Sequence, residues 1–431
     1  MTATFAASHF NLPEDWKARS ERMRERHSLL KVADGTAFLT ALTLYASFRK
    51  AQSESSAVTC KRKDVLELVV ADYQRLADEM EYGFKKAAQL LAEEKIFDPR
   101  FLPYATQLIP LSCICAALSI QIDNASIKEK VLRWYWCGVF GELYGGANET
   151  RFSQDLPDVV DWVNGGDTPR TVKDASFAPR RLLSLQTRIS AAYKGLSILL
   201  MQRGGKDFIS ATPIAINAYF VTPVDIHHVF PKAWCTAKNL PREKWNSVIN
   251  KTPLSTTTNQ YLSGDAPSLY LKRIEEKKGV PSETLDACLR SHAIPVEELR
   301  QNAFDDFIRQ RAILLLDMIE AATGKAVSGR DSDETVMAFV AALLFIFLSI
   351  DAFSCALPCY RAPCCPVTYT GTERIRHHGS RPGGHKRPSG RLRRIQGLRD
   401  IPAVRLWVRQ RESGQGMARQ DQNAPAAGHA A

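Results

Sequence analysis

The chain has 431 residues, of which 45% are hydrophobic and 24% charged, a balance typical of a folded protein of roughly two or three domains. Its net charge of +11 is concentrated at one end, because residues 371–431 hold twelve Arg and Lys386 against four acidic residues, a net +9. The first 370 residues therefore carry only +2. The basic charge of the whole chain does not by itself indicate that the folded part binds nucleic acid.

Apolar residues recur at a helical period over residues 14–140, which predicts helices there. The run 108–122 is almost continuously apolar, but its 15 residues are short for a membrane span and favour a buried core helix. An aromatic-rich helix is expected to end at the glycine pair 145–146. Segment 181–205 is expected to form one amphipathic helix closed by its two final glycines.

Helices are expected again over residues 266–323, followed by a polar linker at 324–334. Residues 336–357 are then expected to form an apolar helix. This helix could be a membrane anchor with its basic flank on the cytoplasmic side, or it could be the last helix of a domain. The anchor is the less favoured alternative, because the fully apolar part is only about 15 residues. Residues 358–431 are rich in Arg, Gly and Pro and predict a disordered basic tail.

Cysteine usage and the N-terminal residues both favour the cytoplasm. Four of the ten cysteines cluster within residues 355–365 in a spacing that matches no usual zinc site. The N-terminal residues show no basic start followed by an apolar run, so no secretory signal is expected. The other cysteines lie scattered in apolar stretches and predict buried free thiols of a reducing compartment: Cys60, Cys113, Cys115, Cys137, Cys235 and Cys288.

The candidate catalytic and metal-binding residues lie in the window 224–275. Its first part, 224–230, favours a strand that ends at Pro231, and residues 248–254 favour a second extended segment. Hydroxyl residues then begin a short helix at 256–262. The expected order is strand, loop, strand and helix.

Four side chains on this frame suit phosphodiester hydrolysis, which needs a base for the attacking water and positive charge at the leaving oxygen. His228 titrates near neutral pH and can act as the base. His227 and the amide oxygen of Asn259 can bind one divalent ion, with water completing its shell. Asn250 is interpreted as a residue that ties the loop to the first strand. Phosphate contacts are expected from Lys232, Lys251, Lys272 and Arg273.

A more ordinary interpretation of the two histidines stays open. A histidine pair before a proline is often packed in a core or part of a structural metal site. The strand, loop, strand and helix with asparagines at both expected points favour the catalytic interpretation.

The segments DIHHVFP (225–231), NKTPLS (250–255) and TTTNQYLSGDAPSLYL (256–271) resemble the HNH (ββα-metal) nuclease module. They are most similar to the version at the C-terminal end of GmrSD-type restriction endonucleases, which are modification-dependent systems of bacteria. Upstream, RWYWCGVFGELYGGANETRF, TRISAAYKGLSILLM and GGKDF resemble the helical middle region of those proteins. The resemblance covers roughly residues 25–335.

The resemblance implies a mainly α protein with a small embedded ββα-metal (HNH) module. A helical domain is expected over 14–205, and a nuclease module with its C-terminal helices over 206–335. The implied activity is hydrolysis of DNA phosphodiester bonds in antiphage restriction. The implied cofactor is one divalent ion, Mg²⁺ or Mn²⁺, with Zn²⁺ or Ni²⁺ as alternatives.

In that motif the residue before the catalytic histidine binds the metal, which implies His227, and the histidine itself is the general base, which implies His228. The central asparagine, here Asn250, orients the loop, and Asn259 on the helix is the other metal ligand. Asp225 matches the acidic position just ahead and is expected to support the metal site.

Full-length members of the family begin with a nucleotide-dependent domain resembling the ParB/sulfiredoxin fold, and no such segment precedes the helices in this sequence. We therefore expect a separate nucleotide-dependent subunit or domain as a partner beside DNA. The alternative is a truncated, non-catalytic remnant or interaction protein of the same family.

Overall fold

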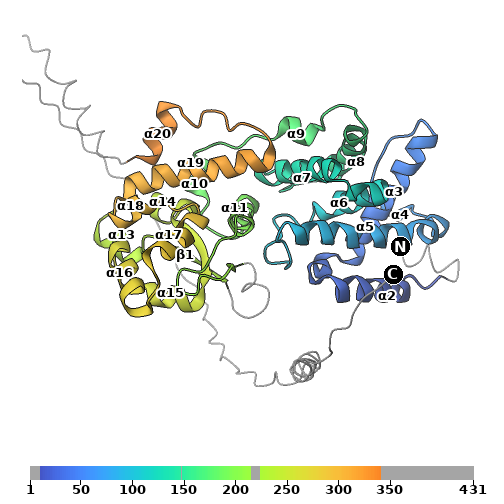
Figure 1. Cartoon of the computed structure of the whole chain (residues 1–431). Helices are drawn as coiled ribbons and strands as arrows, with labels where there is room; N and C mark the ends of the chain where they lie inside the picture. Colours follow the sequence, from blue (N-terminus) through green and yellow to red (C-terminus); the bar gives the residue numbers. More distant parts are fainter. Residues whose placement is uncertain (1–9, 147, 215–223, 341–431) are drawn as a thin grey trace, which may run out of the picture. The chain divides into compact units, whose positions relative to one another are not determined.

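The computed structural model describes residues 10–146, 148–214 and 224–340 (Figure 1). The protein is mainly helical, and the described residues contain one sheet, which has two strands. The expected helical character is therefore confirmed. Of the predicted apolar helix 336–357, the first residues belong to α20 (Asp333–Phe339), and residues 341–357 lie outside the described residues, as does the tail 358–431.

Helices and short 3₁₀ turns make up the described chain before the sheet: α2 Leu12–Arg26, η1 Ser28–Val32, α3 Gly35–Ser53, α4 Arg62–Leu66, α5 Val70–Glu93, α6 Leu108–Leu118, η2 Ser119–Asp123, α7 Ala125–Phe140, α8 Glu149–Val163, α9 Arg170–Asp174, α10 Arg181–Ser184 and α11 Ala191–Gln202. The apolar helix α6 packs against α3, α5 and α8, and all its side chains except Ala117 are buried. It is a core helix, as its length predicted.

One expected helix ends earlier than the sequence pattern indicated, and another is divided into two. The aromatic helix α7 stops at Phe140, because Glu142 takes a left-handed conformation with φ 52° and the Leu143 amide folds back onto the Gly138 carbonyl at 3.1 Å. Segment 181–205 forms two helices instead of one. The carbonyls of Leu185 and Gln186 accept hydrogen bonds from a distant part of the chain, at 2.7 and 2.6 Å, and the helix breaks there.

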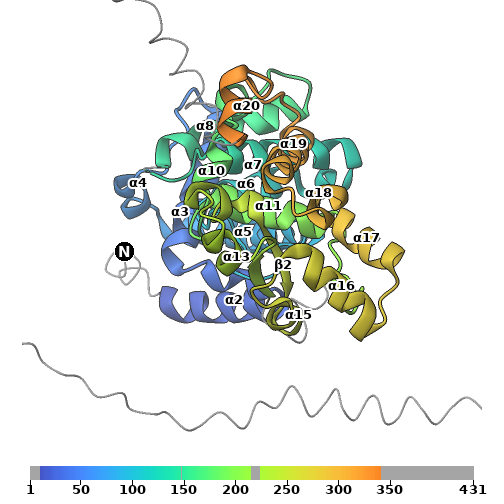
Figure 2. The same ribbon diagram turned by 90° about the vertical axis from the view of Figure 1, so that its left-hand side faces the viewer.

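The sheet is an antiparallel hairpin of β1 (Val224–His228) and β2 (Lys251–Ser255). The connection between them contains α13 Lys232–Ala237, α14 Arg242–Trp245 and the 3₁₀ turn η3 Val248–Asn250. The second strand therefore starts later than expected, because the Asn250 amide closes the turn on the Ser247 carbonyl at 3.2 Å. The hairpin lies between α11 and α15 (Thr256–Leu262) in Figures 1 and 2.

Helices continue after α15, as predicted, and the remaining described ones are α16 Pro267–Lys278, α17 Ser282–Ser291, α18 Val296–Arg300, α19 Phe304–Thr323 and α20. The long helix α19 contacts η3 beside the hairpin and also contacts α7. At its C-terminal end, the Thr323 carbonyl accepts hydrogen bonds from Arg133 Nε at 3.0 Å and from the Cys137 thiol at 3.4 Å. One helix thus joins the hairpin to the N-terminal helices.

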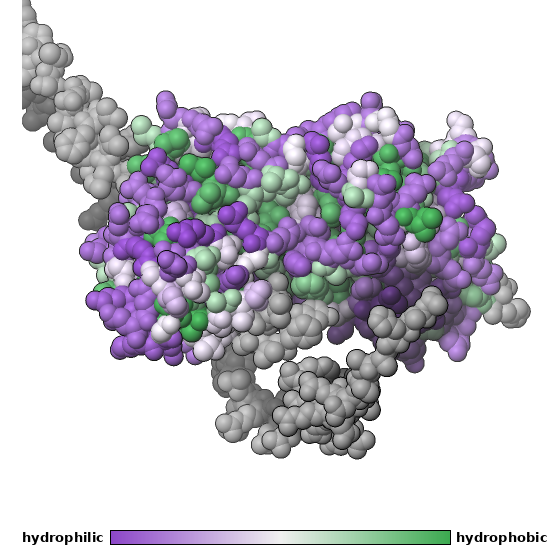
Figure 3. Space-filling model, viewed as in Figure 1, coloured by the Kyte–Doolittle hydropathy of each residue, from purple (hydrophilic) through white to green (hydrophobic). Residues whose placement is uncertain are grey.

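The buried apolar residues of the described chain form one contiguous core that runs from α2 to α20. The six cysteines predicted as buried free thiols are all buried and unpaired by disulfides, which confirms that prediction. Hydrophilic residues dominate the face shown in Figure 3, with apolar residues in scattered small areas. Within the described ranges, no helix combines the length and the apolar character needed to cross a bilayer.

Candidate functional site

The strand register decides which predicted site residues share a face of the hairpin. His228 is opposite Lys251, and His227 is opposite Thr252. Directly opposed residues lie on the same face, and successive residues alternate between faces. The hairpin therefore presents His228 and Lys251 on one face and His227 and Thr252 on the other, and β1 ends at His228.

Asn250 holds the turn that follows β1. Its side chain is fully buried, and its Oδ1 accepts a hydrogen bond from the Phe230 amide at 2.8 Å. Its Nδ2 donates to the Phe230 carbonyl at 2.9 Å and to the Trp245 carbonyl at 2.8 Å. The side chain therefore satisfies three backbone groups of the loop at once, directly beyond His228.

The imidazole of His228 is half-buried and has a side-chain partner that fixes its tautomer. Asn246 Nδ2 donates to Gln186 Oε1 at 3.2 Å, which turns Asn246 Oδ1 toward His228 Nε2 at 3.3 Å. Since an amide oxygen only accepts, Nε2 carries the hydrogen and Nδ1 keeps a lone pair. Burial lowers the pKa of His228, the Asn246 hydrogen bond raises it, and the cations Lys251 and Lys232 lower it further. The ring is therefore neutral at neutral pH and can accept a proton.

Lys251 lies on the same face as His228 and is only 7% exposed. Its ammonium donates to the Gln186 carbonyl at 2.6 Å and lies 6.0 Å from the centre of the Tyr193 ring. Burial lowers its pKa to about 8. A phosphate contact from Lys251 would thus be made inside the site, beside His228, and not on an open surface.

The other face of the hairpin is held by a histidine that the sequence analysis did not single out. His292 is fully buried, and its Nδ1 accepts from the Thr252 hydroxyl at 2.6 Å while its Nε2 donates to the Lys206 carbonyl at 2.8 Å. Burial lowers the pKa of His292 to about 4. His227 is half-buried and lies opposite Thr252 of this pair.

The helix that carries Asn259 is fixed to the hairpin by a buried carboxylate. Ser255 caps α15 by accepting from the Thr258 amide at 3.2 Å, as the hydroxyl pattern predicted. Asp207 then accepts from the hydroxyls of Ser255 at 2.7 Å and Thr258 at 2.6 Å. Burial raises the pKa of Asp207, but these bonds and two backbone amides bring it below its ordinary value. Asn259 itself is half-buried on α15, which contacts both strands.

The other predicted phosphate contacts differ in how accessible they are. Lys232 is exposed at the start of α13, and Lys272 is exposed on α16 with its ammonium 3.6 Å from Glu276. Arg273 instead binds the Asp265 carboxylate and donates to the carbonyls of Tyr261 at 2.8 Å and Leu262 at 3.0 Å. Its donors thus hold the end of α15, an arrangement that does not favour the predicted phosphate contact.

The predicted metal site contains few of the side chains that usually bind metals in proteins. Across residues 10–146, 148–214 and 224–340, no three His, Cys, Asp or Glu side chains gather as a metal site. Asp225 lies in β1 opposite Leu254, and its side chain is outside the described residues. The proposed donors that remain are the His227 imidazole and the Asn259 amide, so the metal site stays a prediction.

Several residues that shape the site could not be found from local patterns. Asn246 and Gln186 orient His228, and Asp207 and His292 fix the two ends of β2. Arg311 is fully buried in α19 and donates to the Ile249 carbonyl at 2.7 Å. Only Asn246 had a usable signal, since it lies in the loop between the histidines and Asn250.

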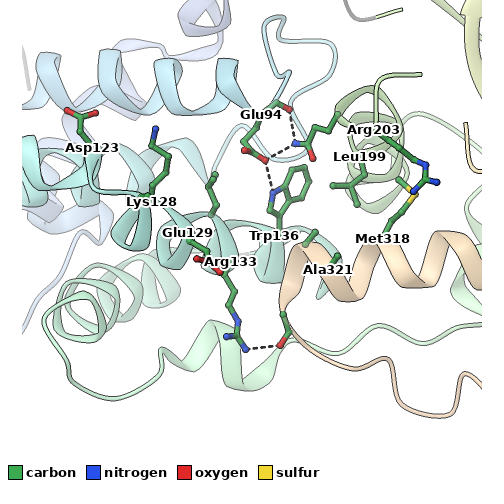
Figure 4. A pocket seen from close by; sticks show the side chains of 15 residues that line it. Glu94, Asp123, Lys128, Glu129, Arg133, Trp136, Leu199, Arg203, Met318 and Ala321 are labelled. Carbon is green, nitrogen blue, oxygen red and sulfur yellow. Dashed lines mark hydrogen bonds between the residues drawn. The ribbon is translucent and has the colours of Figure 1, made fainter. Parts of the chain in front are cut away.

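A cavity of about 710 Å³ lies away from the hairpin, among α7, α11 and α19 (Figure 4). Its apolar lining includes Leu132, Leu199 and Met318. Trp136 and Glu94 also line it, and Trp136 Nε1 donates to Glu94 Oε2 at 3.1 Å. None of the predicted site residues lines it.

The sequence matches no protein-family model. The chain is similar to an uncharacterized protein of Methanocaldococcus jannaschii, with 28% identity over 274 residues. The alignment covers 57% of this chain and 43% of that protein, so the chain spans less than half the length of the curated relative it matches. Because that relative has no stated activity, the similarity favours neither the nuclease prediction nor its alternative.

Proposed function

We propose that the protein is an HNH-type, metal-dependent endonuclease that hydrolyses DNA phosphodiester bonds, with a role in restriction of foreign DNA. The observation that carries the proposal is the clamp made by Asn250 on Phe230, directly after the histidine pair and between two strands that a short helix covers. Holding the loop after the histidines is the role that the resemblance to the HNH module implies for Asn250. The cytoplasm, which the six buried thiols favour, is part of the same proposal.

In this proposal His228 is the general base. Its Nδ1 lone pair takes a proton from water, while Nε2 stays bonded to Asn246, so the ring does not rotate as its charge changes. The water oxygen bonds to phosphorus and the bond to the 3′ oxygen breaks. The 3′ oxygen takes a proton from solvent, which gives a 5′-phosphate and a 3′-hydroxyl. The buried Lys251 ammonium on the same face stabilises the negative charge that develops on the phosphate.

The proposal includes one divalent ion, held by two protein donors and completed by water. His227 offers an imidazole, and Asn259 offers an amide oxygen from a helix that packs against the strand of His227. Bound there, the ion would supply positive charge at the leaving oxygen. His227 and His228 lie on opposite faces of the hairpin, so the proposal requires the phosphate to reach both rings past the end of β1 at His228.

The test is plasmid nicking by the full chain in Mg²⁺ or Mn²⁺, with the His228→Ala variant and a His27→Ala control between α2 and η1. Loss of a general base slows such reactions roughly 10²–10⁴-fold, so His228→Ala should be slower by that factor and His27→Ala should match wild type. His227→Ala should raise the Mn²⁺ concentration that gives the half-maximal rate. Equal nicking by wild type and His228→Ala removes the catalytic assignment, and nicking by none favours the non-catalytic alternative.

A further inference from the structure

The turn between α10 and α11, residues 187–190, carries the most exposed large hydrophobic side chain that the structure describes. Ile189 is 89% exposed. Its neighbour Arg188 is also exposed and has no hydrogen bond or ion pair within the described residues. Thr187 and Ser190 complete the turn, so one apolar side chain projects among polar and cationic neighbours.

Three hydrogen bonds fasten the start of this turn to the candidate site. The Val248 amide donates to the Leu185 carbonyl at 2.7 Å, and Lys251 Nζ donates to the Gln186 carbonyl at 2.6 Å. Asn246, the partner of His228, donates to the Gln186 side chain at 3.2 Å. The position of the turn is therefore fixed relative to the histidine proposed as the base.

The other end of the turn is also fastened. The Ser190 hydroxyl donates to Glu142 Oε1 at 3.4 Å, and Arg181 binds the same carboxylate with two hydrogen bonds of 2.9 Å. The negative charge of Glu142 is thereby neutralised. Arg188 is left as the cation that a partner of this turn would meet.

The chemistry of the turn fits a nucleic-acid duplex better than a protein. One isoleucine among polar residues offers too little apolar area for a stable protein interface. Proteins that bend DNA insert single apolar side chains such as Ile between base steps, and Arg side chains commonly contact the phosphate backbone. Both side-chain types are present here on a turn with fixed ends.

We propose that residues 187–190 are a DNA-contacting turn, in which Ile189 inserts between base pairs next to the phosphate that is cut and Arg188 binds the backbone. This inference rests on the proposed nuclease function, since it assigns the turn to the same substrate. Insertion beside the site would bend the duplex and hold the phosphate against His228.

The test measures binding of the full chain to a fluorescein-labelled duplex that carries 2-aminopurine at A·T steps, whose fluorescence rises when a base is unstacked. EDTA is present so that the duplex is not cleaved during the measurement. Ile189→Ala is compared with Ile120→Ala, whose isoleucine is 78% exposed in η2, and Arg188→Ala with Arg62→Ala in α4. Removing the Ile189 methyl groups that the duplex would bury should raise the Kd about tenfold and abolish the rise in 2-aminopurine fluorescence that unstacking produces. Arg188→Ala should reduce the slope of log Kd against log salt by about 1.

The inference is overturned if both turn variants bind and unstack DNA like their controls. It is also overturned if Ile189→Ala changes only the sedimentation of the protein, because a second copy then covers the turn. If the wild-type protein binds and unstacks DNA but never nicks it, the nuclease proposal fails and the DNA-contacting turn stands. If both turn variants nick DNA as the wild type does, the DNA-contacting turn fails and the nuclease proposal stands.

Discussion

Replacing Asn250 with alanine should destabilise the loop between the two strands far more than a surface substitution would. The side chain is fully buried and makes three hydrogen bonds to the backbone of Phe230 and Trp245. Each such bond contributes about 1 kcal/mol, so their joint loss should cost about 3 kcal/mol. A local opening that is about 3 kcal/mol easier exposes the loop roughly 100-fold more often.

Hydrogen exchange read by mass spectrometry measures this opening directly. The amides of Val229 and Phe230, which donate to the Asn250 carbonyl and side chain, should exchange roughly 100-fold faster in Asn250→Ala. The matched control is Asn124→Ala, which removes an exposed cap of α7 that accepts from the Ser126 amide at 2.9 Å. Such a cap is worth about 1 kcal/mol and should affect only the first turn of α7. If exchange at Phe230 is unchanged, the clamp does not hold the loop and the site has no fixed geometry.

Two further substitutions test the surroundings of the hairpin. The pKa of His292 is about 4 in the folded chain, below its ordinary 6.5. Between these pH values the unfolded chain binds a proton at this histidine and the folded chain does not, so the free energy of unfolding decreases as the pH falls from 6.5 to 4. His292→Gln should lessen the slope of unfolding free energy against pH there by up to about 1.4 kcal/mol per pH unit, and urea unfolding curves that keep the wild-type slope would contradict this. Arg273→Lys keeps the charge but loses the forked bonds to Tyr261 and Leu262, so exchange at the end of α15 should rise. Unchanged exchange with weaker DNA binding would instead favour the predicted phosphate contact.

Local patterns were sufficient where the neighbouring residues decide the structure. The cap of α15 is set by Ser255 and Thr258, three residues apart, and the burial of α6 follows from its continuous apolar run. Most of the strand expected over 224–230 was predictable from its β-branched residues, but β1 ends at His228, because the Val229 and Phe230 amides donate to Asn250. These elements depend on interactions within a few residues.

The partners of the site were not predictable, because they come from far away along the chain. Gln186 reaches Asn246 and Lys251 across 60 and 65 residues, and Asp207 reaches Ser255 across 48. The same contacts broke the expected helix over 181–205. Its apolar period is intact, but two of its carbonyls bind the hairpin instead of the next helical turn.

The course of α19 bears on how the hairpin region could be studied alone. This helix of 20 residues spans about 30 Å, and it binds the turn before β2 through Arg311, near its middle, and α7 through Thr323 at its C-terminal end. A fragment that starts at residue 206 would keep Arg311 but lose the carbonyls of Leu185 and Gln186. The Lys251 ammonium would then lose both the Gln186 carbonyl and the Tyr193 ring that it contacts. We therefore expect a segment excised at residue 206 to hold its hairpin less firmly than the same residues do within the full chain.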